Sequence, residues 1–273
     1  MPRRWCMPLT TLALIFGSML AVAGTASAAS MMHPATTGVA HPSVQPGGIM
    51  VRPGSGFRPG ARSTRDTTVG STNWSGYAVT GGNGAFNSVS ASWTEPTGIC
   101  STRKSSYSSF WVGLDGFNSS SVEQTGTDVD CSRLTPRYYG WYEMYPAFPV
   151  NFSNPVKPGD HLSASVTFSG SQTFTLVLHD ATRGWTQTIT KNQSGLARSS
   201  AEVITEAPSS TSGVLPLADF GKVNYSVSAA NGTSLGSQHP TEIIMVDNHG
   251  APKDSTSAIS STGAFSNTWI RSN

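Results

Sequence analysis

Residues 161–190 read HLSASVTFSGSQTFTLVLHDATRGWTQTIT, and this stretch decides the fold class. Its runs 161–168, 174–179 and 185–190 each alternate polar and apolar residues with a period of two. Alternation in Ser, Thr, Val and aromatic residues is typical of strands that bury one face. Arg183-Gly184 lies between the last two runs and is typical of a hairpin turn. The stretch therefore predicts consecutive antiparallel strands.

The rest of the chain favours the same class. Residues 88–93 (SVSASW) alternate in the same way, and no long run has the periodicity of an amphipathic helix. No repeat of fixed period is present, which disfavours a propeller. We expect an all-β fold, an antiparallel β-sandwich of two packed sheets of the concanavalin A-like or jelly-roll type.

The N-terminus has the pattern of an export signal. Arg3 and Arg4 precede an apolar stretch at 7–23, and residues 26–28 (ASA) fit the small-x-small cleavage rule. Residues 1–28 are therefore predicted to be a signal peptide, and the mature protein is expected to be secreted and extracellular. The alternative is a membrane anchor, but polar residues interrupt the run and no second stretch of about 20 apolar residues follows. We expect no membrane association after signal removal.

Composition changes near residue 70. Residues 29–70 are rich in Pro, Gly and small polar residues and cannot bury enough apolar surface to fold alone. They are predicted to be disordered, either a linker or a pro-segment. All seven Tyr and six of the seven Trp lie at or after Trp74, so residues 71–273 are predicted to form the folded domain.

The charge distribution excludes some partners. The chain has a net charge of +2, to which residues 1–28 contribute +2 and residues 29–70 contribute +3. From Ser71 onward, 11 basic and 14 acidic residues give −3. A mildly acidic domain is not expected to bind nucleic acid or anionic membranes. We expect a monomer.

Two cysteines remain after Cys6 leaves with the signal peptide. Cys100 and Cys131 form an even pair in an exported chain, which predicts a disulfide that closes a loop of about 30 residues. The alternative, a reactive thiol, needs a neighbouring His that the sequence does not offer nearby.

Several catalytic chemistries are absent from the sequence. It has no Asp-Thr-Gly or Asp-Ser-Gly and no His-Glu-x-x-His. The six His residues are scattered without metal-ligand spacing, so we expect neither a metal nor another cofactor.

Carboxylates and aromatic rings are concentrated on predicted strands. Trp141, Glu143 and Tyr145 share one face of their strand, and Glu202 and Glu206 share one face of another. Flat rings with a few orienting acids suit a groove that binds a polymer. The alternative is that the rings pack the core and the acids face water.

Seven motifs occur in the order and approximate spacing of the glutamic peptidases of family G1, the eqolisins. They are NWSGY (73–77), WTEPT (93–97), WVGLDG (111–116), QTG (124–126), WYEMYP (141–146), AEVITE (201–206) and ADFG (218–221). The chain resembles this family over essentially the whole predicted domain. The resemblance implies a β-sandwich of two antiparallel sheets and a secreted, pepstatin-insensitive acid endopeptidase that acts on proteins and peptides. It also implies a removable pro-segment.

The resemblance implies a Gln/Glu dyad at Gln124 and Glu202. Glu206 is a rival for the role of Glu202, which is preferred because Ala201 and the spacing to Pro208 follow the family motif. Val203 stands where the family usually has Trp. Seven residues are candidates for substrate contacts or for support of the dyad: Trp111, Asp115, Asp128, Trp141, Glu143, Tyr145 and Glu206.

The dyad also fits the chemistry of peptide hydrolysis. A carboxylate at Glu202 can take a proton from water and return it to the leaving amine. The amide of Gln124 does not titrate and can donate a hydrogen bond to the tetrahedral oxyanion at any pH. The competing hypothesis is a secreted carbohydrate-binding or glycoside-hydrolysing sandwich, with Glu202 and either Glu206 or Glu143 as paired acids. A third is an inactive relative that acts in adhesion.

Overall fold

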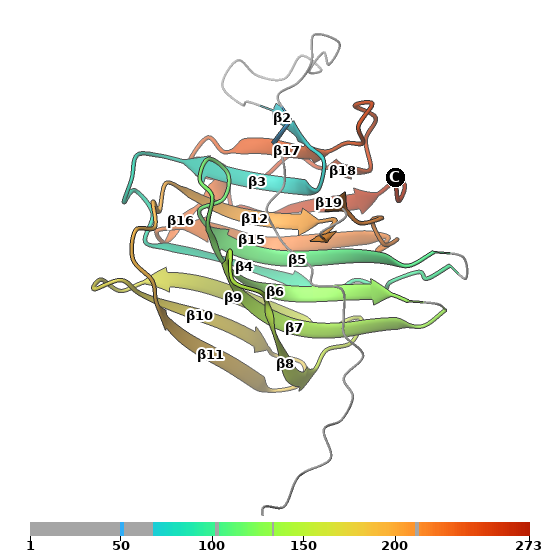
Figure 1. The fold of residues 1–273 in the computed structure, drawn as a ribbon, viewed down its shortest axis with the longest axis horizontal. Helices are drawn as coiled ribbons and strands as arrows, with labels where there is room; N and C mark the ends of the chain where they lie inside the picture. The colour runs from blue at the N-terminus through green and yellow to red at the C-terminus, as the bar shows by residue number, and fades with distance from the viewer. Residues whose placement is uncertain (1–49, 52–67, 102–103, 133, 211–212) are drawn as a thin grey trace, which may run out of the picture. The chain divides into compact units, whose positions relative to one another are not determined.

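Two large β-sheets lie face to face in the computed structural model, which describes residues 50–51, 68–101, 104–132, 134–210 and 213–273 (Figure 1). Sheet one has nine strands in the order β1 (Met50–Val51), β2 (Thr68–Ser71), β17 (Thr241–Met245), β3 (Trp74–Thr80), β12 (Ser200–Glu206), β5 (Ser106–Leu114), β6 (Val122–Cys131), β7 (Pro136–Tyr145) and β8 (Val150–Pro155). Sheet two has eight in the order β11 (Trp185–Asn192), β10 (Thr173–Asp180), β9 (His161–Phe168), β4 (Ser88–Thr94), β15 (Lys222–Ala230), β19 (Phe265–Trp269) and β18 (Asp254–Thr256), with β16 (Thr233–Ser234) paired to β15. A short hairpin of β13 (Ser209–Ser210) and β14 (Gly213–Val214) stands apart from both.

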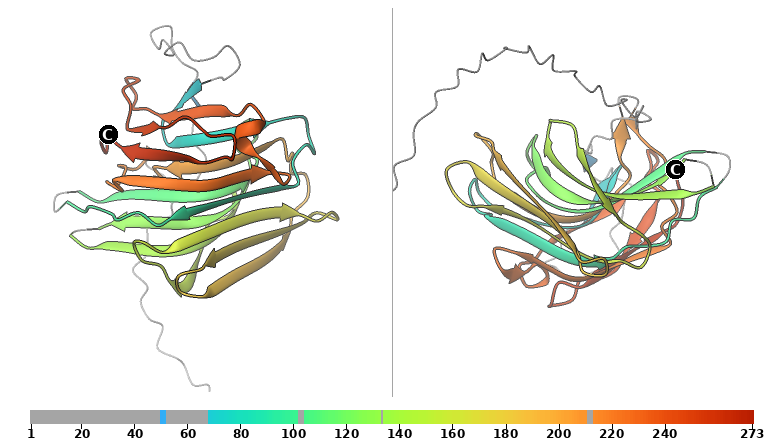
Figure 2. Two further views of the ribbon diagram at one scale, coloured as in Figure 1. Left: turned by 180° about the vertical axis from the view of Figure 1, so that it is seen from behind. Right: turned by 90° about the horizontal axis from the view of Figure 1, so that it is seen from below.

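The expected all-β sandwich is confirmed. The pairs within both sheets are antiparallel except that β17 pairs with β2 in parallel. Among the described residues the helical element is one 3₁₀ turn, η1 (Leu235–Ser237), and no helix there is long and apolar enough to cross a membrane. Figure 2 shows the two sheets from behind and from below.

The period-two pattern places the main core between the sheets. In β10, Phe174, Leu176 and Leu178 are buried while the residues between them are half-buried and point away from sheet one. Val112 on β5 and Val203 on β12 belong to the same core and cover it from sheet one. Val203 is therefore a core residue with no exposed surface.

The opposite face of sheet one, here called the outer face, carries a second apolar cluster. Strands β6 and β12 are buried at every position, because side chains on both of their faces are covered. The cluster on the outer face comprises Trp74, Ala78, Trp111, Val122, Trp141, Ile204 and Ile243, with Val69, Phe117, Tyr139 and Tyr145 packed at its edges. Trp74 and Trp111 meet edge to face, with ring centroids 5.0 Å apart.

The N-terminal predictions fall mostly outside the described residues, including the whole of the 1–28 signal peptide. Within 29–70, residues 50–51 form β1 and residues 68–70 begin β2. Strand β2 lies between β1 and β17 in sheet one. The sheet therefore begins before residue 71, the expected start of the domain.

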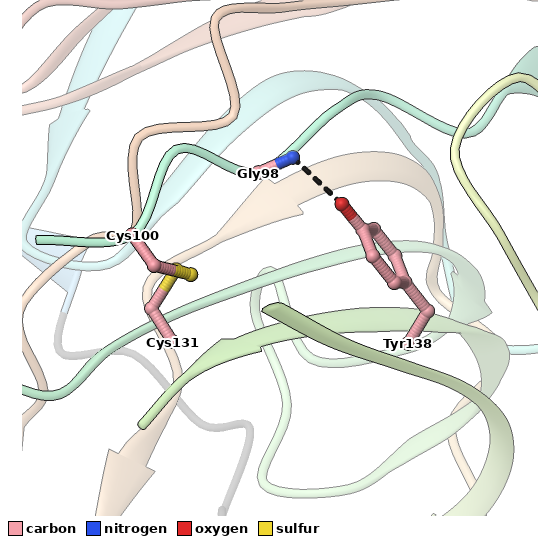
Figure 3. Close-up of a disulfide and its surroundings, with 4 residues drawn as sticks. All are labelled: Gly98, Cys100, Cys131 and Tyr138. Atoms are coloured by element: carbon pink, nitrogen blue, oxygen red, sulfur yellow. Dashed lines mark hydrogen bonds between the residues drawn. A yellow bond between two sulfur atoms is a disulfide. The ribbon is translucent and has the colours of Figure 1, made fainter. Parts of the chain in front are cut away.

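The predicted disulfide between Cys100 and Cys131 is confirmed (Figure 3). Cys131 ends β6, Cys100 lies in the connection from β4 to β5, and their Cα atoms are 5.1 Å apart. Close by, the backbone N–H of Gly98 donates to the Tyr138 hydroxyl at 2.8 Å. Both contacts fasten this connection to the β6–β7 hairpin.

Candidate active site

A row of three polar side chains and one glycine crosses the outer face. It is built from β12, β5, β6 and β7, which lie side by side in sheet one (Figure 1). Glu202 is paired with Gly113, Gly113 with Gln124, and Gln124 with Glu143. Neighbouring strands are about 4.8 Å apart, so the Cα atoms of Glu202 and Gln124 are about 10 Å apart. The residue between them is glycine, so β5 itself adds no side chain to the row at this position, and Trp111 and Val122 approach it from neighbouring positions.

Gln124 is held by Glu143 on the neighbouring strand. Its Nε2 donates to Glu143 Oε2 at 2.8 Å, and both residues have no exposed surface. A primary amide has two N–H groups, so one remains for another acceptor. Oε1 of Gln124 and Oε1 of Glu143 make no hydrogen bond within the described residues. One N–H of the amide is thus fixed by Glu143, and the second is not used in that bond.

Burial makes Glu143 a neutral partner. It raises the pKa of this carboxyl to about 10, and the nearby Glu206 adds to the rise, while the bond from Gln124 opposes it. Glu143 is therefore protonated throughout the acid range. It can fix the amide without placing a negative charge beside a developing oxyanion.

Glu202, like Glu143, has no exposed surface. The backbone N–H of Phe117 donates to its Oε1 at 3.3 Å, and its Oε2 has no hydrogen-bond partner in the described part of the chain. Burial raises the pKa of Glu202 well above its ordinary value, and negative Asp115 and Glu123 add to the rise. The neutral carboxylic acid is therefore its favoured form in this site.

Glu206, the rival acid, has both of its oxygens occupied. Asn73 Nδ2 donates to Oε1 at 3.0 Å, and Trp111 Nε1 donates to Oε2 at 2.8 Å. Its place four residues along β12 puts its Cα about 13 Å from that of Glu202. Glu206 holds the Trp111 ring, whereas Glu202 Oε2 makes no hydrogen bond among the described residues.

Two predicted subsite tryptophans flank a glycine next to the row. Gly126 is paired with Trp111 on one side and with Trp141 on the other. Trp141 Nε1 donates to Asp128 Oδ1 at 2.7 Å, as Trp111 does to Glu206. Trp111 has no exposed surface and Trp141 has 4 %. Both rings belong to the outer-face cluster, which forms an apolar floor beside the dyad.

Asp115 positions the loop that covers Glu202. It follows β5 with φ at +68°, and its two oxygens accept the backbone N–H groups of Arg198 (2.6 Å) and Ser199 (2.9 Å). This ties the start of the 115–121 loop to the entry of β12, so that the Phe117 N–H meets Glu202. Tyr145, the last predicted residue, is half-buried at the edge of the outer-face cluster.

Four features of the site were missed from the sequence. Gly113 and the Phe117 N–H have no side-chain chemistry to indicate them, and Asn73 lies far from Glu206 along the chain. Buried Glu123, next to Gln124 on the opposite face of β6, was also missed. No group of three or more His, Cys, Asp or Glu within the described ranges is arranged to hold a metal ion.

A family model described as the Peptidase A4 family matches residues 72–269, which include every residue of the row. The chain belongs to this family. The match confirms the resemblance to the glutamic peptidases of family G1.

Individual relatives agree with this membership. Aspergillopepsin-2 of Aspergillus niger is 30% identical over 146 residues, which are 51% of this chain and 51% of that protein. The chain thus aligns with about half the length of this curated relative. A crystal structure of scytalido-glutamic peptidase with a transition state analog inhibitor has a TM-score of 0.63 at 26% identity and covers 73% of this chain and 98% of its own. The crystal structure of aspergilloglutamic peptidase from Aspergillus niger has a TM-score of 0.54 at 26% identity. This match covers 60% of this chain and 99% of the aspergilloglutamic peptidase chain.

Proposed function

We propose that this protein is an exported acid endopeptidase that hydrolyses peptide bonds in proteins and peptides with Gln124 and Glu202. The observation that carries the proposal is the row in which a buried acid and a buried amide flank Gly113 on neighbouring strands. Family membership supports peptide hydrolysis. The Cys100–Cys131 disulfide supports export, since such bonds persist in oxidising compartments.

In the proposed reaction Glu202 transfers protons and Gln124 stabilises the oxyanion. Ionised Glu202 takes a proton from a water molecule through Oε2 while the water oxygen bonds to the peptide carbonyl carbon. The free N–H of Gln124 donates to the oxyanion that forms, and Glu143 keeps the amide in place. Glu202 then gives its proton to the amide nitrogen, the C–N bond breaks, and an acid and an amine are released.

Burial of Glu202 suits this cycle. The pKa rise means that few molecules carry the carboxylate at acid pH, but in those molecules the base is stronger than an exposed glutamate. Proton transfer from water creates the neutral carboxylic acid that the site favours. Burial thus helps to stabilise the tetrahedral intermediate.

Paired-acid glycoside hydrolysis fits the row less well. A retaining enzyme holds its two carboxyl groups about 5 Å apart. The Cα atoms of Glu202 and Glu143 are three strand spacings apart, about 14 Å, and Gln124 lies between them. Glu206 is occupied by Asn73 and Trp111.

The test is digestion of an unfolded protein substrate from about pH 2 to about pH 7, with pepstatin present. It compares wild type with Gln124→Ala and Glu202→Gln, and uses Glu242→Gln, on β17 of the same sheet, as the matched control. Wild type and the control should cleave, and both dyad variants should lose at least about a hundredfold in kcat. Cleavage at the wild-type rate by either dyad variant, with circular dichroism unchanged, would refute the assignment.

A further inference from the structure

A second group of acids lies on the outer face, away from the dyad. Asp128 and Asp130 follow each other on the same face of β6, with 4 % and 2 % of their surface exposed. Both reach one phenol on β7: the Tyr139 hydroxyl is 3.0 Å from Asp128 Oδ2 and 2.9 Å from Asp130 Oδ2. The mechanism proposed above does not use this group, here called the acid-phenol unit.

The acid-phenol unit is connected to the floor beside the dyad. Tyr139 is the cross-strand partner of Asp128, and Trp141 is its diagonal neighbour on the same strand. Asp128 therefore accepts from Tyr139 with Oδ2 and from Trp141 Nε1 with Oδ1. Glu143 follows Trp141 by two residues on the same face of β7. One carboxyl thus joins the phenol to the tryptophan next to the catalytic row.

The two contacts of the Tyr139 oxygen need two protons. A phenol has one O–H and can donate it to a single carboxyl. With both acids ionised, the second carboxylate oxygen would face the phenol oxygen at about 3 Å with no proton between them. If one acid is protonated, that acid donates to Tyr139 and Tyr139 donates to the other. The observed geometry therefore fits a unit that holds one extra proton.

We propose that Asp130 and Tyr139 are positioning residues that hold Asp128 through this shared proton, and that Asp128 in turn holds Trp141 in place for peptide binding. Loss of the proton loosens Trp141 and weakens substrate binding, with a smaller effect on the chemical step. The consequence for peptide binding depends on the proposed function, whereas the proton and the Trp141 contact do not.

The surrounding charges favour retention of the proton at acid pH. Burial raises the pKa of both Asp128 and Asp130, and the charge of Asp130 adds to the rise at Asp128. The charge of Asp128 in turn raises the pKa of Glu206, Glu143 and Glu95. On the other side, Arg137 stabilises the charged form of Asp130. Raised carboxyl pKa values mean that the unit is complete in acid and loses its proton as the pH approaches neutrality.

Asp130→Asn tests the proposal directly. The Asn amide can donate to the Tyr139 oxygen at every pH, which leaves the Tyr139 O–H for Asp128. KM is measured from about pH 4 to about pH 7 with a fluorogenic peptide taken from a site that wild type cleaves. In wild type, KM should rise about tenfold or more over this range, and in Asp130→Asn it should stay nearly constant with kcat unchanged. Asp219→Asn, which removes a charge outside sheet one, should behave as wild type.

A spectroscopic arm tests the unit without any assay of cleavage. The near-UV circular dichroism of Trp141 is obtained over the same pH range as the difference between each protein and its Trp141→Phe counterpart. Wild type should show a transition that Asp130→Asn lacks. Tyr139→Phe, which removes the shared hydroxyl, should show the neutral-pH signal even in acid and a raised KM. This variant also covers the case in which Asp130→Asn does not fold.

The outcomes separate the two proposals. A Trp141 transition that persists in Asp130→Asn, or no transition in wild type, would overturn the acid-phenol unit. An equal rise of KM with pH in wild type and Asp130→Asn would overturn its role in peptide binding. Failure of wild type to cleave any protein, with the Trp141 transition present and abolished in Asp130→Asn, would reject the peptidase and leave the unit supported.

Discussion

Gly113→Ala places a methyl group between the two proposed catalytic side chains. An ideal Cβ at this position would lie 2.8 Å from Cζ3 of Trp111, 3.0 Å from Cγ1 of Val122 and 3.3 Å from Cβ of Gln124. The first contact is shorter than packed carbon atoms allow, and the Trp111 ring is held by its bond to Glu206. The ring, the strand or Gln124 must therefore move.

The expected costs differ between stability and activity. Overpacking costs about 1–3 kcal/mol, and the lower backbone entropy of Ala in the unfolded chain returns about 0.5–1 kcal/mol. A net loss of up to about 2.5 kcal/mol lowers Tm by up to about 10 °C in a domain of this size. A shift of about 1 Å in catalytic geometry can lower the rate about a hundredfold. Activity should thus fall far more than stability.

The assay measures kcat/KM and the thermal unfolding of Gly113→Ala beside Gly82→Ala. Gly82 lies in an exposed loop, and a Cβ there would meet no atom within 4 Å, so this control should be neutral in both measurements. Wild-type kcat/KM in folded Gly113→Ala would refute the argument that Glu202 and Gln124 act together across Gly113.

Two further predictions concern stability. Replacing both Cys100 and Cys131 by Ala should lower the free energy of unfolding by about 3–4 kcal/mol, because the bond closes a loop over a sequence separation of 31; equal urea midpoints for the variant and the oxidised wild type would contradict this. Burial raises the pKa of Glu95 from 4.5 to about 8, so the stabilising effect of its neutral form is complete below about pH 4.5 and is lost as the pH rises towards 8. The free energy of unfolding is measured with urea at about pH 4.5 and about pH 8. Between these pH values Glu95→Gln should lose less stability than wild type, by up to about 5 kcal/mol. Equal losses in the two proteins would show that Glu95 does not cause the pH dependence.

The sequence was most informative for strands that have one buried face and one face nearer to solvent. In β4 and β10 the buried positions alternate with half-buried ones, so the period-two pattern predicted both the strands and the core. In β6 and β12 every residue is buried, and polar residues such as Gln124 and Glu202 break the apolar pattern without facing water. The outer-face cluster was therefore not predictable from alternation.

The sequence indicated which residues form the site, but not how the strands that carry them are aligned with one another. Family motifs indicated Gln124 and Glu202, but the alignment of β12 with β5 depends on residues far apart in the chain, so the place of Gly113 between them was hidden. Shared faces within one strand were easier to infer. Asp130 follows Asp128 by two positions and could have been placed beside it by the same rule that grouped Trp141 with Glu143.

The strand order of sheet one also has a consequence for folding kinetics. Strands β5, β6 and β7 follow one another in the chain and pair as neighbours, so Gln124 and Glu143 can meet through local contacts. Strand β12 pairs with β3 and β5, and residues 115–199 separate it from β5 along the chain. Pairing between segments so far apart in sequence is slow. A nascent or partly folded molecule would thus carry the amide half of the site before the acid half. Hydrolytic competence should appear in the last phase of refolding, after most β-structure has formed.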